Sequence, residues 1–140
     1  MSEVSLKALL IPEKTVTLEY DDVHCDGFKV DLCHVAREEL NKLRKSCVTT
    51  KLDRKTRQPV EDFDEDKFLD LYIDKIIKGW SGLKYRYLEE LLLVNVTNQD
   101  PDDCLIFNAD NARTLMQNST EFDSWVTSEA SNLENFTTNK

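Results

Sequence analysis

The stretch DEDKFLDLYIDKIIKGWSGL, residues 64–83, decides the fold class that we expect for this chain. It opens with Asp64, a good helix N-cap, and two further acids follow in the first turn, where negative charge is favourable. Apolar residues then recur at helical spacing from Phe68 to Ile77. Gly79 is placed to end this helix, and Trp80 lies in the tight break that follows it.

The same helical period of apolar residues appears in four other segments. Two of them run from Arg37 to Ser46 and from Tyr85 to Leu93. The other two begin at polar residues that cap helices well, Asn108 for one, and Ser119 or Thr120 for the other. With the helix after Asp64, the sequence predicts five helices.

Alternation of apolar and polar residues, which is typical of a strand with one buried face, occurs near the N-terminus. It covers Thr15 to Tyr20 and then Phe28 to Cys33, and the polar residues between them predict a β-hairpin with a longer loop. The segment Thr49 to Val60 is polar and basic. We expect a loop there, or a short ribbon that turns near Arg54-Lys55.

These elements together predict a mainly α fold, a single domain of about five helices with a small N-terminal β-hairpin. We expect a flexible N-terminal arm over residues 1–14, one globular domain over residues 15–136, and a short C-terminal tail over residues 137–140. A chain of 140 residues is long enough to bury such a core without disulfides or metals.

Composition narrows the possible partners and the compartment. The formal net charge of −9 disfavours nucleic acid, because neutralising phosphates requires an excess of Lys and Arg. No apolar run approaches the roughly 20 residues of a membrane span. The N-terminus lacks the basic region and the cleavage site of a signal peptide, so we expect a cytoplasmic protein whose four cysteines are free thiols.

Combinations of residues that bind metals or carry out catalysis are weak in this sequence. The pairs His24-Cys25 and Cys33-His34 resemble a zinc ligand set, but neighbouring residues of a strand point to opposite faces. The acidic residues from Asp62 to Asp70 lack the central Gly and the final Glu of a calcium loop. No nucleophile, base and oxyanion turn occur together. We therefore expect no metal, no cofactor and no enzymatic activity.

Two groups of residues are candidates for protein binding. The first surrounds the tight break, where a tryptophan between glycines serves either as an interface anchor or as a core plug. It consists of Trp80, Leu83, Tyr85 and Tyr87. The second group predicts self-association, in which a basic stretch meets an acidic stretch on a neighbouring copy; the alternative is an ordinary solvated loop. It consists of Arg54, Lys55 and Arg57 with Glu61, Asp62 and Asp64.

The order of several motifs also resembles a known protein family. The motifs are Arg37-Glu38-Glu39-Leu40 in the first helix, the run from Asp53 to Val60, the capped Asp64 to Phe68, the break from Lys78 to Leu83, and the late run from Asn118 to Val126. Together they resemble the tail assembly chaperones of long-tailed, siphovirus-type bacteriophages, over roughly residues 20–136.

The resemblance implies a transient, self-associating assembly factor in the host cytoplasm. Such a protein binds the tape measure protein, keeps it soluble and recruits subunits of the tail tube (major tail) protein. It is absent from the mature virion, and it commonly has a longer form made by ribosomal frameshifting. Two alternatives stay open, a structural virion protein such as a tail completion or connector subunit, and an enzyme with a metal site in the hairpin.

Overall fold

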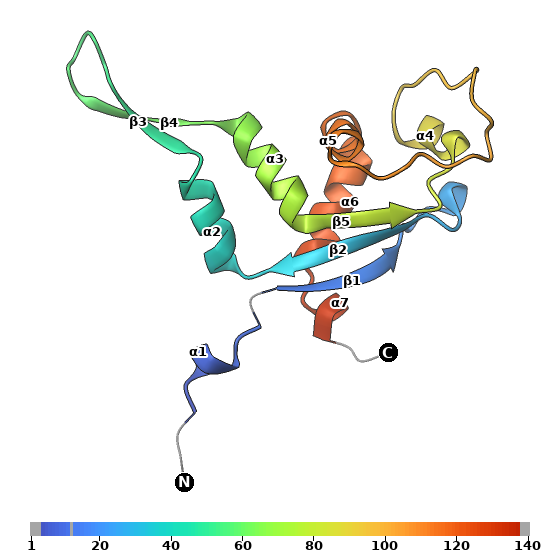
Figure 1. Ribbon diagram of the computed structural model, residues 1–140, viewed down its shortest axis with the longest axis horizontal. Helices are drawn as coiled ribbons and strands as arrows, with labels where there is room; N and C mark the ends of the chain where they lie inside the picture. Colours follow the sequence, from blue (N-terminus) through green and yellow to red (C-terminus); the bar gives the residue numbers. More distant parts are fainter. Residues whose placement is uncertain (1–3, 12, 138–140) are drawn as a thin grey trace.

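The computed structural model describes residues 4–11 and 13–137, and it contains two antiparallel sheets (Figure 1). The first sheet has three strands in the order β1-β2-β5, which are β1 (Glu13–Glu19), β2 (Lys29–Val35) and β5 (Ile77–Ser81). The second is a two-stranded hairpin of β3 (Val48–Leu52) and β4 (Pro59–Phe63). The hairpin projects from the body at the upper left of Figure 1.

The helices precede, connect or cover these strands. They are α1 (Leu6–Leu9), the short 3-10 helix η1 (Val23–Cys25), α2 (Arg37–Lys45), α3 (Glu65–Ile76), α4 (Tyr85–Leu91), α5 (Ala109–Asn118), α6 (Thr120–Ser131) and α7 (Glu134–Thr137). Three predicted N-caps are confirmed, since the side chains of Asp64, Asn108 and Ser119 each accept a hydrogen bond from a backbone N–H three residues later.

The core lies between the three-stranded sheet and the helices that pack on one of its faces, α6 among them. Phe28 and Phe122 are fully buried, and their rings stack with centroids 6.0 Å apart. Tyr20 meets Trp125 of α6 edge-on at 5.0 Å. Burial of these rings holds the sheet against α6, because aromatic side chains remove large apolar areas from water.

The predicted fold class, mainly α with one small hairpin, is wrong. Over the described residues the protein is mixed α/β, with 46% of them in helices, 23% in strands, and sheets of three and two strands. The predicted helix from Asp64 ends at Ile76, and Ile77–Ser81 continues as β5. In the register of β2 and β5, Leu32 lies opposite Ile77 and Val30 lies opposite Trp80. All four side chains are buried there, and this tertiary packing overrides the helical spacing.

The segment from Thr49 to Val60 forms a ribbon, which the sequence left as the alternative to a loop. Lys51 lies opposite Val60, and Leu52 lies opposite Pro59. The turn beyond them includes Arg57, which has a positive φ of 56°. The ribbon was hard to predict because its exposed side chains do not alternate between buried and solvated positions.

Candidate functional site

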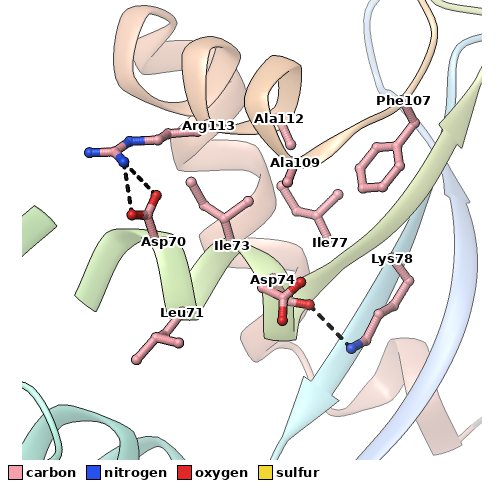
Figure 2. A pocket seen from close by; sticks show the side chains of 10 residues that line it. All are labelled: Asp70, Leu71, Ile73, Asp74, Ile77, Lys78, Phe107, Ala109, Ala112 and Arg113. Atoms are coloured by element: carbon pink, nitrogen blue, oxygen red, sulfur yellow. Dashed lines mark hydrogen bonds and ion pairs between the residues drawn. The ribbon is translucent and has the colours of Figure 1, made fainter. Parts of the chain in front are cut away.

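A cleft of about 450 Å³ opens between α3, the start of β5 and α5 (Figure 2). Its apolar floor consists of Ile73 and Ile77, and α5 contributes Ala109 and Ala112 from the opposite side. Alanine side chains are too short to fill the space between the two helices. Ile73, Ile77 and Ala112 are at most 3% exposed. The apolar surface that a partner's side chain can bury therefore comes from Ala109 and from the half-buried Leu71 and Phe107.

Charged side chains form the rim of the cleft. The guanidinium of Arg113 on α5 is 2.7 Å from the carboxylate of Asp70 on α3, and it lies 3.6 Å from Asp66. Lys78 donates a hydrogen bond to the backbone carbonyl of Asp74 at 3.2 Å (Figure 2). Among the described residues, the carboxylate of Asp74 forms no ion pair and stays open to a partner.

The spacing of residues in α3 explains why apolar floor and acidic rim run side by side. Asp66, Asp70 and Asp74 are four residues apart, so they follow one line along the helix. Ile73 lies beside this line on α3, and Ile77 follows directly after the helix as the first residue of β5. Ion pairs of partly exposed side chains such as Asp70–Arg113 contribute only modestly to stability, and so the rim mainly determines which charges a partner meets.

Phe107 closes the cleft from the long loop before α5. Its ring meets that of Trp80 edge-on, with centroids 5.0 Å apart. The indole Nε1 of Trp80 donates a hydrogen bond to the carbonyl of Leu105 at 3.0 Å. Trp80 thus holds the loop that positions one wall of the cleft.

The residues predicted around the tight break lie mostly in the core. Leu83 is fully buried and Trp80 is 9% exposed, which corresponds to the core-plug alternative for this tryptophan. Tyr87 is buried too, and its hydroxyl donates a hydrogen bond to the carbonyl of Asp26. Tyr85 is half-buried, so a binding role for its exposed part stays a prediction.

The residues predicted for self-association lie in and beside the projecting hairpin. Arg54, Lys55 and Arg57 are exposed at its turn. The predicted acidic partners follow on β4 and at the start of α3, namely Glu61, Asp62 and Asp64. Asp62 forms an ion pair with Lys51 of the same hairpin, and Asp64 caps α3. The basic turn has no such pairing with these acids among the described residues, and its partner stays a prediction.

Titratable side chains outside the cleft do not gather into a reactive group. Within residues 4–11 and 13–137, no three His, Cys, Asp or Glu side chains are placed to hold a metal ion. His34 is engaged through Nδ1 with the carbonyl of Ala130 at 2.8 Å. Burial, with a smaller effect of Asp22, raises the pKa of Cys25 to about 11, and this keeps the thiol protonated near neutral pH.

The cleft was not predicted from the sequence, although the residues of one of its walls, on α3, follow a visible pattern. The four-residue spacing of Asp66, Asp70 and Asp74 marks an acidic line beside the apolar stripe of α3. Nothing in the sequence indicated that Phe107 and α5 would lie across from that line, because their contact joins segments more than 30 residues apart.

Comparison of the chain with protein-family models, with curated proteins and with solved structures finds no match. None of the helices in the described part of the chain is long and apolar enough to cross a membrane.

Proposed function

We propose that this protein is a tail assembly chaperone that binds an apolar, helical segment of a tape measure protein. The cleft between α3 and α5 is the binding site. The chaperone keeps the tape measure protein soluble, recruits tail tube subunits and leaves before the virion is complete. Two observations support this proposal, the open apolar cleft with its charged rim and the motifs that resemble the chaperone family.

The cleft suits an amphipathic helix as its partner. Such a helix presents apolar side chains at positions i, i+3, i+4 and i+7, which can enter a groove in a row. Ala109 and the half-buried Phe107 supply apolar surface for that row, beside the buried floor of Ile73 and Ile77. Asp74 and Lys78 at the rim meet the polar side chains that flank it.

The physical need for such a protein comes from the length of its partner. An elongated protein with repeated apolar stripes aggregates when the stripes are exposed to water. Many copies that each bind weakly along one chain reach a high total affinity, because they are held side by side. A shallow cleft on a small domain is therefore sufficient.

Filling the cleft tests the proposal directly. Ala109 is exposed at the start of α5, and its side chain is one of those that line the cleft (Figure 2). We expect Ala109→Trp to occupy the cleft, leave the thermal midpoint nearly unchanged and abolish co-purification with a co-expressed tape measure protein. Gln117→Trp is the matched control, since Gln117 is exposed on α5 and does not line the cleft.

Two results would contradict the proposal. Equal co-purification by both tryptophan variants would remove the cleft as the binding site. A tape measure protein that stays soluble alone and never co-purifies with the wild-type chain would remove the chaperone function itself. Detection of the chain in purified mature tails would favour a structural virion protein.

A further inference from the structure

The N-terminal arm, residues 4–11, carries a concentrated set of exposed apolar side chains. They are between 59% and 72% exposed, and they are Val4, Leu6, Leu9, Leu10 and Ile11. The short helix α1 within this arm has no buried residue. Five large aliphatic side chains within eight residues are a high local concentration of exposed apolar groups, and such concentrations mark interaction sites in many proteins.

The arm is shaped to enter a groove. Leu6 and Leu9 are spaced i and i+3 within α1, so this turn places them on the same face, and Leu10 follows directly at its C-cap. Lys7 stands next to this face, and it forms no ion pair among the described residues. The arm thus combines an apolar face with one positive charge.

The cleft between α3 and α5 has the complementary features. Its floor is apolar, and its charged side chains are the acids Asp70 and Asp74 with the cations Lys78 and Arg113, of which Arg113 pairs with Asp70. Because the Asp74 carboxylate is not paired among the described residues, it is available to Lys7 of an incoming arm. Burial of three leucine side chains is the main driving force, at roughly 25 cal/mol per Å² of apolar surface.

Within one copy, the N-terminal arm and the α3–α5 cleft lie at opposite edges of the three-stranded sheet. The arm enters the sheet at β1, one edge strand, whereas the cleft lies beside β5, the opposite edge strand. Figure 1 shows α1 lying apart from the body, directed away from α3 and α5. A neighbouring copy can offer its cleft without any reversal of the arm.

We infer that the N-terminal arm of one copy docks in the α3–α5 cleft of a second copy. Arm and cleft are different surfaces, so the contact is heterologous and each added copy leaves one free arm and one free cleft. The copies therefore join into an open chain. Resting on the proposed function, the arm also competes with the tape measure protein and covers the cleft until that partner displaces it.

Complementing variants test the inference. Leu6→Asp with Leu9→Asp spoils the arm and leaves the cleft intact, whereas Ala109→Trp fills the cleft and leaves the arm intact. Sedimentation velocity should show concentration-dependent assemblies for the wild type and monomers for each variant alone. A 1:1 mixture of the two variants should stop at a heterodimer, because that pair retains no working arm and no working cleft.

The control places the same two charges on exposed leucines outside the arm and the cleft. Leu93 and Leu133 are 103% and 57% exposed, and Leu93→Asp with Leu133→Asp should assemble like the wild type. A wild type that stays monomeric at every concentration overturns the inference, and protection of its arm from protease would then indicate docking within one copy. The inference is also overturned if the Ala109→Trp variant assembles like the wild type.

Failure of this inference is distinguishable from failure of the proposed function. If the mixed variants form the heterodimer but the wild type never binds a tape measure protein, the inference stands and the proposed function falls. If the tape measure protein binds in the cleft and the mixture stays monomeric, the reverse holds. If both hold, the arm variant should bind the tape measure protein more tightly than the wild type does.

Discussion

The body of the molecule and its two projections, the N-terminal arm and the β3–β4 hairpin, use apolar residues in opposite ways. In the body, Phe28, Leu32 and Phe122 are fully buried between the sheet and its helices. In the projections, Leu6 is 72% exposed and Leu52 is 68% exposed. The difference separates stability from recognition, because buried groups hold the fold and exposed ones are available to partners.

Trp80→Ala is the change with the largest expected effect, and it tests whether this tryptophan belongs to the body. Removing its buried ring and the hydrogen bond to Leu105 should cost about 3–5 kcal/mol of the free energy of unfolding. Leu52→Ala on the hairpin should cost less than about 1 kcal/mol, since Leu52 is 68% exposed. Denaturant unfolding measures both. If both variants lost a similar amount of unfolding free energy, the hairpin would contribute to stability as the body does, and the distinction between them would be wrong.

Gly82→Ala should give the second-largest effect on stability. It tests how closely the backbone of Gly82, just before α4, packs against that of Gly27. Gly82 has a φ of +71°, and a Cβ there would lie 2.2 Å from the carbonyl oxygen of Gly27. Gly27 has a φ of +83° with open space around it. Gly27→Ala should therefore cost only the strain of about 1–2 kcal/mol, and Gly82→Ala clearly more. Equal costs in chemical unfolding would show that the backbone shifts easily at this point.

The two regions also differ in how far the sequence predicted them. Helix caps such as Asp64 and Asn108 depend on residues three positions apart, so their effect is visible locally and the predicted caps are confirmed. β5 depends on pairing with β2, whose residues lie more than 40 positions away. A single sequence contains no direct signal for that pairing. The apolar stripe from Phe68 to Ile77 was read as one helix, and so the start of β5 at Ile77 was missed.

The candidate site shows the same limit. Of the acids on the rim, Asp66 was placed in the first turn of the predicted helix and Asp70 was weighed only as part of a calcium loop. The wall opposite them comes from α5 and Phe107. The apolar arm was visible too, as a loosely held segment, although its apolar residues were not recognised as a surface. The sequence could not show which surface faces the acids of α3 or which surface the arm could contact, because such surfaces form only after distant segments have packed.

The pH dependence of the free energy of unfolding should differ between a buried cysteine of the body and an exposed cysteine of a loop. The pKa of Cys25 is raised from 9.0 to about 11, first by burial, so the unfolded chain ionises at lower pH than the folded protein does. The stabilising effect is complete below pH 9 and is lost as pH rises towards 11. Unfolding titrations should therefore show stability falling over this range, and Cys25→Ala should flatten the slope. Cys104 is exposed, so Cys104→Ala should leave the slope unchanged.

The smallest effect on stability is expected for charge reversal at the hairpin turn. Arg54, Lys55 and Arg57 are exposed, and exchanging all three for Glu should leave the thermal midpoint nearly unchanged. The effect on assembly separates two kinds of contact between copies. If the basic turn meets an acidic surface of a neighbour, assembly of the wild type weakens as salt rises, because exposed charges are screened over about 8–10 Å at moderate salt.

An apolar arm in a cleft responds differently, since burial of leucine side chains does not weaken with added salt. Light scattering of the wild type, the triple Glu variant and the arm variant across a salt series therefore assigns the contact. Assembly that survives high salt and survives charge reversal, but is lost when Leu6 and Leu9 become Asp, places the contact in the arm. Assembly lost at high salt and by charge reversal alone would place it in the hairpin and leave the arm's apolar surface for another partner.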